Sequence, residues 1–436
     1  MQLLTGVMNL RIGILALLSA ISAVNADNWA VLVAGSKSWS NYRHQAGVCH
    51  AYQVLHDHGI PDDHIVVMMY DDLADNFENP TPGVVINRPD GPNVYEGIVK
   101  DYTGRDVTPD VFFKVLTGDE AGVAGIGSGK VIKSGPEDHI FINMVDHGNV
   151  GFFSFPSDHM YADDLFKVIK DMHDNNQYKE MVMYMESCES GSLYDGIYPD
   201  NIGFYVTTSA DPSESSYACY FDELRDTYIG DQFGCCWMEN SDESDLTTLT
   251  LGDQYQIIYE CNYQSHSPWY GQPSMRDEVV GVFLGMGKTQ QRKSSGGSRS
   301  KDDAVPSVDV PLFILKNKMK KANGDEKIAL QAQINGLFKK REFVQETTKN
   351  IATLVTGDEE LAEYYIENPM RKVNDWACYK RAVDAFNDKC FRFGENPFAM
   401  TMTPTLLNLC ENNFGADNIV RRIEQVCNFG FVSGIE

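Results

Sequence analysis

Five short runs of apolar residues, separated by polar segments long enough to be helices, constrain the fold of this chain most strongly. They occupy residues 29–33, 64–70, 139–145, 181–186 and 203–208. Continuous apolar runs of this length are typical of strands buried on both faces, and helix-length connections are typical of parallel pairing. The segment up to about residue 287 is therefore predicted to be an α/β domain, with a mostly parallel sheet flanked by helices.

The composition changes after this domain. Residues 288–307 (KTQQRKSSGGSRSKDDAVPS) are too polar to form a core, so they predict an exposed linker. The residues that follow show helical spacing without strand alternation. We therefore divide the chain into the α/β domain (27–287), a linker (288–323) and a small helical domain (324–436).

The N-terminus predicts an export signal. Arg11 precedes an apolar run, and Val24 and Ala26 place small residues at the −3 and −1 positions of a cleavage site. The run is shorter than the roughly 20 residues that a membrane span needs. We predict a signal peptide over residues 1–26, no membrane span, and a product that is secreted or held in a vesicle, where cysteines oxidise.

Charge excludes one class of partner. The chain has 62 acidic and 36 basic side chains, a formal net charge of -26. Binding to nucleic acid or to an anionic membrane requires clustered Lys and Arg, so neither is predicted. An acidic chain suits a compartment of low pH, where many carboxylates lose their charge.

The ten cysteines are unevenly distributed. Four lie within the last 60 residues: Cys378, Cys390, Cys410 and Cys427. In a secreted chain they predict two disulfides, with three possible pairings that spacing does not resolve. Elsewhere, Cys235 and Cys236 are adjacent and too close to bridge easily, so one of them is a candidate partner for Cys261. None of the ten forms a C-x-x-C zinc motif, and no metal or other cofactor is predicted.

Two motifs that suggest ligand binding lack the residues they need. GIGSGK at residues 125–130 resembles a phosphate-binding loop, but Ala124 replaces a required Gly and Val131 a required Ser or Thr. It is predicted to be a surface loop. His56 and His58 end a helix predicted to run from Cys49, so they do not predict a metal site.

Polar motifs follow two of the predicted strands. DHG occupies residues 146–148, and ESCESGS occupies residues 186–192. Since ligands bind at the carboxyl ends of parallel strands, Cys188 and His147 can share one crevice. A thiolate is a nucleophile, and an imidazole activates it and later protonates the leaving amine. Gly148 lacks a Cβ, so its N–H can approach the substrate oxygen and form an oxyanion hole with the N–H of Cys188.

The alternative is that Cys188 is a core residue, since buried cysteines are common and DHG also occurs at a helix end, residues 57–59. Its position after a strand, among small polar residues, favours the catalytic interpretation.

These motifs stand within longer blocks that together resemble the legumain family of asparaginyl endopeptidases. The blocks are WAVLVAGS (29–36), NYRHQ (41–45), CHAY (49–52), IVVMMYDD (65–72), NPTPGVVINRP (79–89), DYTG (101–104), DHG (146–148), ESCESGS (186–192) and ESSYACY (214–220). The resemblance covers essentially the whole chain after the signal. It implies a caspase-like fold and a lysosomal cysteine protease that cleaves after Asn, and after Asp at low pH, made as a zymogen with a helical C-terminal prodomain.

The resemblance also implies roles for individual residues. Cys188 matches the nucleophile, His147 the general base and acid, and Asn41 the residue that orients the histidine. Ser215 and Ser216 match the segment that pairs with the substrate backbone. Asp146 matches an aspartate that can form a succinimide and has been tied to peptide ligation, a possible side activity.

Three further residues match the walls of the specificity pocket: Arg43, Glu186 and Asp231. A carboxamide has one acceptor and two donors, so Arg can donate to its oxygen while two carboxylates accept from its nitrogen. An Asp side chain would meet like charge there, and we expect it to be accepted only when pocket carboxyls are protonated.

In the family, the prodomain is removed by cleavage after an Asn that matches Asn323, and we expect acid to weaken its contact by protonating interface carboxylates. Asp302, Asp303 and Asp309 are candidate secondary cuts. The family pattern implies Cys378–Cys410 and Cys390–Cys427 disulfides. Implied partners are Asn-bearing proteins and peptides, the chain's own prodomain and cystatin-type inhibitors.

Two departures and two alternatives accompany this interpretation. Residues 117–119 read TGD where many family members have an integrin-type RGD, and residues 232–237 (QFGCCW), beside the pocket, carry two cysteines. One alternative is a transamidase that attaches lipid anchors, disfavoured by the lack of a C-terminal membrane segment. The other is a catalytically silent protein that binds through its prodomain, disfavoured by the intact candidate site.

Overall fold

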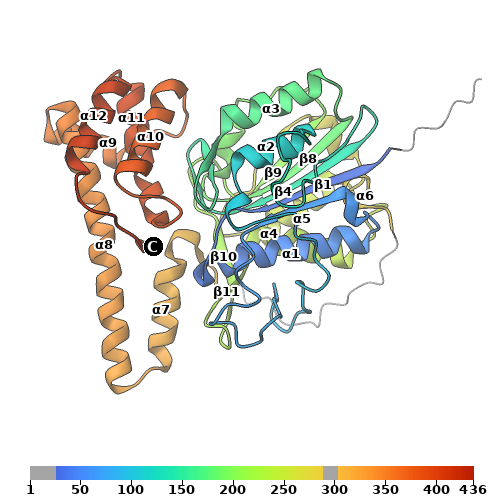
Figure 1. The fold of residues 1–436 in the computed structure, drawn as a ribbon, viewed down its shortest axis with the longest axis horizontal. Coiled ribbons are helices and arrows are strands. Elements are labelled where there is room, and N and C mark those ends of the chain that lie inside the picture. The colour runs from blue at the N-terminus through green and yellow to red at the C-terminus, as the bar shows by residue number, and fades with distance from the viewer. Residues whose placement is uncertain (1–25, 288–302) are drawn as a thin grey trace, which may run out of the picture.

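The computed structural model describes residues 26–287 and 303–436. It consists of an α/β domain beside an elongated helical region that runs down one of its ends (Figure 1). The predicted signal peptide, apart from its last residue, and residues 288–302 of the predicted linker lie outside the described residues. No helix in the described residues is long and apolar enough to cross a membrane.

A seven-stranded sheet forms the centre of the α/β domain, in the order β12-β9-β8-β4-β1-β2-β3. Its strands are β1 (Asn28–Ala34), β2 (Ile65–Met69), β3 (Tyr102–Thr103), β4 (His139–Val145), β8 (Glu180–Glu186), β9 (Phe204–Thr208) and β12 (Trp269–Gly271). Every neighbouring pair is parallel except β9 with β12. The five predicted strands are confirmed, and so is the mostly parallel sheet.

Helices cover both faces of this sheet. On one face lie α1 (Tyr42–Asp57), α4 (Gln232–Glu243), α5 (Leu251–Cys261) and α6 (Gly281–Leu284), and on the other α2 (Pro109–Thr117) and α3 (Ala162–Asp174). Successive residues of β1 point to opposite faces of the sheet. Leu32 packs in the core beneath the first set of helices and Val33 in the core beneath the second set. This burial on both faces explains why the strands are continuously apolar.

The strand register brings the predicted catalytic motifs to one edge. Ala34 of β1 pairs with Val145 of β4, which pairs with Glu186 of β8. The residues that follow these three therefore emerge together at the carboxyl edge of the sheet. β2 and β4 lie on opposite sides of β1, so the chain reverses its direction of winding at this place, where α/β sheets bind ligands.

One predicted helix start is wrong. α1 begins at Tyr42, seven residues before the predicted start at Cys49, and ends at Asp57 as expected. The correction matters because it puts Arg43 and His44 in the first turn of a helix.

The loop at residues 125–130 is confirmed as a loop, and its lysine has a structural role. Lys130 Nζ donates to the carbonyl oxygens of Asp62 and Ile65 at 2.9 Å and pairs with Asp101 at 3.0 Å. These contacts tie the loop to the β2 end of the sheet.

Two small antiparallel sheets flank the carboxyl edge of the central sheet, where the predicted catalytic motifs lie. One contains β10 (Tyr217–Asp222), β11 (Thr227–Asp231) and β13 (Val305–Pro306), and the other contains β5 (Gly148–Asn149), β6 (Phe152–Ser154) and β7 (His159–Tyr161). β13 falls within the predicted exposed linker, yet Val305 is buried and pairs with Ala218 of β10. This part of the predicted linker is therefore an ordered strand, and a helix over Val310–Lys321 follows it within the same predicted range.

The helical region contains α7 (Val310–Lys321), α8 (Gly324–Thr356), α9 (Glu359–Glu367), α10 (Trp376–Lys389), α11 (Thr403–Glu411) and α12 (Ala416–Val426). Disulfides join Cys378 to Cys410 and Cys390 to Cys427, as the resemblance implied. A third joins Cys236 to Cys261, which identifies the member of the adjacent pair that bridges α4 to α5.

The helical region packs against the α/β domain through apolar and charged contacts. Phe152 stacks on Phe393 with ring centroids 5.8 Å apart, and Tyr379 donates to the Val150 carbonyl at 2.9 Å. Lys380 lies 2.7 Å from Asp163 on α3. These contacts hold the helices beside the carboxyl edge of the sheet.

Candidate active site

Cys188 and His147 lie beyond the ends of neighbouring strands β8 and β4 and line one cavity, together with Asn41 and Gly148. His147 Nε2 lies 2.9 Å from Asn41 Oδ1. The Cys188 sulfur lies 3.6 Å from the hydroxyl oxygen of Ser216. The structure therefore brings together the predicted nucleophile, base and orienting amide, which are far apart in sequence.

Burial keeps both reactive groups neutral in this form of the chain. Burial, with the nearby charge of Glu189, raises the pKa of Cys188 to about 12. Burial and the positive charge of Arg43 lower the pKa of His147 to about 3. The pair is thus a thiol beside a neutral imidazole, whereas the thiolate is the nucleophilic form.

Gly148 occupies a position where a side chain does not fit. A Cβ there would lie 2.9 Å from Ser187 Oγ and 3.1 Å from the Phe152 carbonyl oxygen. The missing Cβ allows the backbone to pass close to the β8 end, as the predicted oxyanion hole requires.

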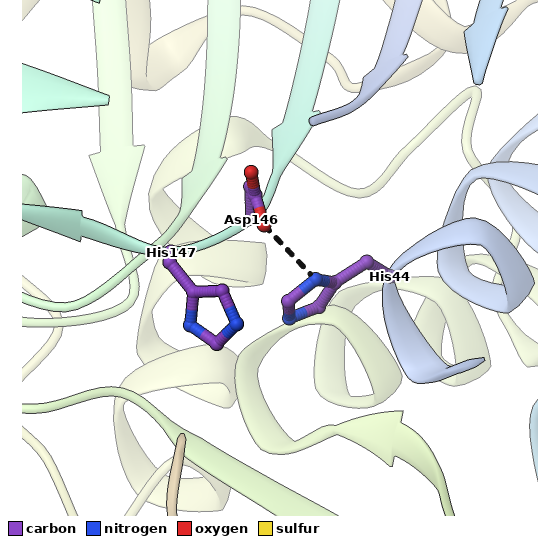
Figure 2. A group of neighbouring side chains, drawn as sticks. All are labelled: His44, Asp146 and His147. Atoms are coloured by element: carbon purple, nitrogen blue, oxygen red, sulfur yellow. Dashed lines mark ion pairs between the residues drawn. The ribbon is translucent and has the colours of Figure 1, made fainter. Parts of the chain in front are cut away.

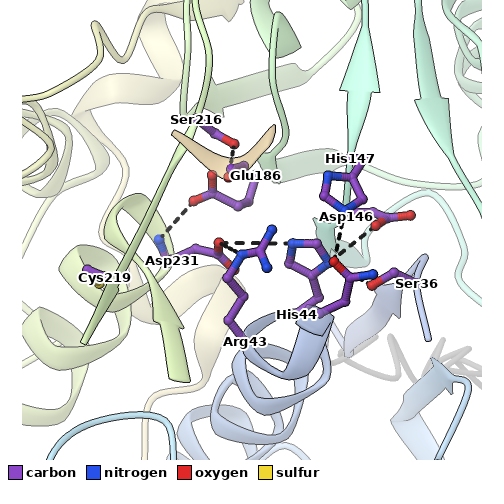
Figure 3. A network of polar contacts seen from close by, with 12 residues as sticks. Ser36, Arg43, His44, Asp146, His147, Glu186, Ser216, Cys219 and Asp231 are labelled. Atoms are coloured by element: carbon purple, nitrogen blue, oxygen red, sulfur yellow. Dashed lines mark hydrogen bonds and ion pairs between the residues drawn. The ribbon is translucent and has the colours of Figure 1, made fainter. Parts of the chain in front are cut away.

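The predicted pocket residues form a buried polar group, with Arg43 in the first turn of α1, Glu186 at the end of β8 and Asp231 at the end of β11 (Figure 3). Arg43 Nε lies 2.8 Å from Asp231 Oδ1, and the Gly234 N–H donates to Glu186 Oε2 at 3.3 Å.

One atom of each residue has no hydrogen-bond partner within the described residues: Arg43 Nη2, Glu186 Oε1 and Asp231 Oδ2. One free donor and two free acceptors match the hydrogen-bonding groups of a carboxamide.

Both pocket carboxyls bind protons more readily than usual. Burial, together with the charge of Asp231, raises the pKa of Glu186 well above its ordinary range. Burial raises the pKa of Asp231 to about 6, although Arg43 opposes that shift. The charge of the pocket therefore changes at mildly acidic pH.

His44 is a buried residue that the sequence analysis did not single out (Figure 2). Its Nδ1 lies 2.6 Å from Ser36 Oγ and 3.2 Å from Asp146 Oδ1, and its Nε2 lies 4.0 Å from Asp231. Its ring meets the ring of His147 edge to face at 5.1 Å. His44 therefore connects the pocket to the strand end that carries His147. His44 lies in the block NYRHQ, but its place beside Arg43 in the first turn of a helix could be inferred only once the helix was known to begin at Tyr42.

Within the residues that the structure describes, two groups of side chains have donor atoms close enough to hold a metal ion: His44 with Asp146 and His147, and Asp211 with Glu214 and His266. In the first group, ring nitrogens of both histidines already contact Asn41 and Ser36. In the second, His266 Nδ1 contacts Glu214 at 2.7 Å. Polar contacts within the chain therefore explain why the side chains of each group lie close together.

The chain covers its own candidate site. Following β13, the Ser307 N–H donates to the Ser216 carbonyl at 2.9 Å, and the two hydroxyl oxygens lie 3.0 Å apart. Arg371 of the helical region lies 3.8 Å from Glu189, the residue after Cys188. Arg43, Glu186 and Asp231 do not line the cavity that Cys188 lines in this covered form.

Ser215, Ser216 and Asn323 are the remaining predicted site residues. Ser215 lines the cavity, and Ser216 is buried between Cys188 and Ser307. Asn323, the predicted processing site, is exposed between α7 and α8.

This fold and site define a cysteine endopeptidase covered by a C-terminal helical domain. The chain belongs to the peptidase C13 family, whose model matches residues 28–286, and a model of the legumain prodomain matches residues 332–427.

Similar proteins include legumain of Rattus norvegicus, 46% identical over 92% of both chains, and legumain of Homo sapiens, 43% identical over 92% of this chain and 93% of the other. Vacuolar-processing enzyme of Citrus sinensis is 38% identical over 92% of this chain and 84% of its own. Among solved structures, caspase-1 from Spodoptera frugiperda gives a TM-score of 0.35 at 12% identity, covering 62% of this chain and 92% of that one. The family assignment comes from the sequence matches.

Proposed function

We propose that this endopeptidase hydrolyses peptide bonds after Asn, and after Asp at acidic pH, and that its zymogen activates itself at low pH by cleavage after Asn323. The observation that carries the proposal is the set of three unpartnered pocket atoms, one donor on Arg43 and one acceptor each on Glu186 and Asp231. An Asn side chain satisfies all three, whereas a hydrocarbon side chain would leave them buried and unpaired.

The proposed mechanism follows from the contacts of His147. Its Nε2–H donates to Asn41 Oδ1, which leaves Nδ1 to take the proton from Cys188. The thiolate attacks the carbonyl carbon, and the N–H groups of Gly148 and Cys188 stabilise the oxyanion. His147 then protonates the leaving amine, and water hydrolyses the thioester.

Covering by the prodomain accounts for the inactive precursor. The prodomain supplies Arg371 to the lining of the cavity that Cys188 lines, where burial raises the Cys188 pKa, and the linker places Ser307 against Ser216. Cleavage after Asn323 frees the prodomain, and a secondary cut after Asp302 or Asp303 would free the segment that carries Ser307. Once both have left, water and substrate can enter, so the Cys188 pKa should fall toward its usual value.

Cleavage after Asn323 is proposed to occur between molecules. The turn between α7 and α8 projects from the body of the molecule, at the opposite end of α7 from the C-terminus (Figure 1). Asn323 is exposed there, so the active site of a second molecule can reach it.

The effect of acid on the contact depends on which carboxylate titrates. Although burial opposes it, hydrogen bonds from His159 and Tyr161 lower the pKa of Asp384, so its contribution to docking is lost as pH falls through that lowered value. Burial raises the pKa of Glu189 to about 8, so protonation of Glu189 favours the docked state instead. Acid release is therefore proposed to depend on Asp384.

We propose that the protein enters the secretory pathway and acts in a lysosome or other acidic vesicle, or after secretion. An acidic compartment fits the pocket carboxyls, whose protonation widens specificity. Cystatin-type inhibitors and peptide ligation stay predictions from the resemblance. Ligation requires an amine, in place of water, to attack the thioester, so sequencing the products in the presence of an added peptide amine tests it.

Incubating the full-length chain at mildly acidic pH and then assaying peptides with Asn, Asp or Arg before the scissile bond tests the proposal. We expect a new terminus after Asn323 and Asn-selective activity. Cys188→Ala should lose both, and Cys49→Ala, which removes another buried thiol, should keep both. Selective cleavage after Arg, or activity that persists in Cys188→Ala, would contradict the proposal.

A further inference from the structure

Two free thiols lie side by side behind the wall of the specificity pocket. Cys219 on β10 and Cys235 near the start of α4 have sulfur atoms 3.9 Å apart, and both side chains are buried. Neither belongs to the three disulfides of the described residues, and the proposed mechanism uses neither. Figure 3 shows Cys219 close to Asp231.

The local backbone leaves room for the Cys235 sulfur. Cys219 pairs across the small sheet with Gly230 of β11. A Cβ at Gly230 would lie only 2.5 Å from the Cys235 sulfur, so any other residue there would displace it. The sulfur thus lies directly over the residue that precedes Asp231, which connects its position to the pocket wall.

The neighbouring cysteine shows that the same helix already carries a cross-link. Cys236 is bonded to Cys261 of α5. Successive residues of a helix point about 100° apart, so Cys235 faces a different partner, Cys219. The first turns of α4 are therefore joined to α5 by a disulfide on one side, and on another side they carry one of the two free thiols.

We propose that Cys219 and Cys235 are a reversible disulfide site that reacts with low-molecular-weight disulfides such as oxidised glutathione and adjusts the specificity pocket. One thiolate attacks the small disulfide, forming a mixed disulfide and releasing one small thiolate. The second cysteine, deprotonated, attacks the mixed disulfide at the protein sulfur and releases the other. Two protein thiols are oxidised to one disulfide, and the small disulfide is reduced to two thiols.

Closing the bond requires movement at the pocket wall. A disulfide is about 2.05 Å long, so the sulfurs must approach by about 1.9 Å. α4 also supplies the Gly234 N–H that donates to Glu186, and it begins immediately after Asp231. We expect closure to draw this part of α4 toward β10 and to change the positions of both pocket carboxyls.

The burial of the two thiols makes the reaction slow in the folded chain. Burial raises the pKa of Cys219. The hydrogen bond from Cys219 lowers the pKa of Cys235, but burial and nearby carboxylates outweigh it and leave that pKa raised. Thiolate is therefore scarce until the region opens or while the chain is still folding, and a disulfide formed here is protected afterwards.

Disulfide mapping of the full-length chain tests the site itself, without relying on activity. The protein is equilibrated at neutral pH with glutathione buffers from reducing to oxidising, blocked with an alkylating reagent under denaturing conditions and digested without reduction. We expect a peptide that links Cys219 to Cys235, lighter by two hydrogens than the separate peptides, while Cys49 carries the reagent. The site is refuted if both cysteines carry the reagent wherever Cys236–Cys261 is intact, or if Cys235 links to Cys261.

A second measurement tests the effect on the pocket, which rests on the proposed function. The zymogen is oxidised while Cys188 is covered, then activated by acid and assayed with an Asn peptide. We expect KM to rise by about 2- to 10-fold, the effect of weakening one hydrogen bond, with kcat within about 2-fold.

Cys235→Ala is the matched control, because it keeps Cys188 and the Cys236–Cys261 disulfide but cannot form the link. Its KM should not respond to oxidation. A mapped Cys219–Cys235 link with an unchanged KM would refute the effect on the pocket. If no sample cleaves after Asn, the proposed function is refuted. The disulfide mapping still decides whether the redox site exists.

Discussion

Lowering the pH from 7.5 to 5 should raise cleavage after Asp, relative to cleavage after Asn, by about 30-fold. The reason is the charge of Asp231, whose pKa burial raises to about 6. With that pKa, about 3% of Asp231 is protonated at pH 7.5 and about 91% at pH 5. If only the protonated pocket accepts a carboxylate, the ratio of the two kcat/KM values follows this fraction.

Protonation of the substrate would give a different pH profile. A peptide Asp side chain has a pKa of about 3.9, so a change caused by the substrate would have its midpoint near pH 4, whereas titration of Asp231 levels off below about pH 5. The sign follows from the pocket: a raised pKa means that Asp231 gains its proton on acidification and stops repelling the substrate carboxylate. Burial also raises the pKa of Glu186, so its titration acts in the same direction.

The assay is competitive cleavage of two peptides that differ only by Asn or Asp before the scissile bond, followed by mass spectrometry. Because both peptides meet the same enzyme sample, loss of folded enzyme cancels from the ratio. Asp231→Asn should make the ratio nearly independent of pH. That variant removes a buried charge that pairs with Arg43 at 2.8 Å, so its stability should fall by about 3–5 kcal/mol.

Asp226→Asn, at a half-buried position in the turn between β10 and β11, is the control and should keep the wild-type pH profile. The reasoning is refuted if the wild-type ratio is flat from pH 7.5 to 5, if its midpoint lies near pH 4, or if Asp231→Asn retains the full change.

Three shorter predictions concern the base, the interface and a disulfide. Asn41→Ala removes the 2.9 Å contact to His147 Nε2 and should lower kcat by roughly 10- to 100-fold with little change in KM, as measured by steady-state kinetics. Phe393→Ala removes a ring stacked on Phe152, which should weaken docking by about 3–5 kcal/mol and speed activation at a given pH, whereas the exposed Phe431→Ala should not. Cys236→Ala opens a disulfide with a sequence separation of 25 residues and should lower the unfolding free energy by about 3 kcal/mol, as measured by denaturant titration.

The sheet and the placement of Cys188 near His147 were predictable from sequence for a physical reason. Strands buried on both faces are continuously apolar, so the runs that became β4 and β8 were visible without any structure. The polar motifs that contain His147 and Cys188 directly follow those runs. Parallel pairing then brings the two motifs to one edge.

The start of α1 could not be found by periodicity. Almost every residue from Tyr42 to Leu55 is buried, including Arg43 and His44, so no polar face alternates with an apolar one. Helix patterns depend on that contrast. The same burial of polar groups hid the contact of His44 with Asp146.

The ordered structure of residues 305–307, within the predicted linker, could not be predicted from local sequence either. Val305 and Ser307 lie in a polar, Gly- and Ser-rich stretch, and their burial depends on pairing with β10, which is about 90 residues earlier in the chain. Which of the two adjacent cysteines bonds to Cys261 also depends on tertiary structure, because Cys235 and Cys236 have the same local sequence but Cys236 faces α5.

In the proposed mechanism, the first turn of α1 connects substrate recognition to catalysis. Asn41 precedes the helix and contacts the base, Arg43 lies in the pocket, and His44 lies between the pocket and Asp146. Arg43 also lowers the pKa of His147 through its charge. A substitution at Arg43 therefore removes the donor for the carboxamide oxygen and, at the same time, raises the pKa of the base, so it changes KM and the pH dependence of kcat together.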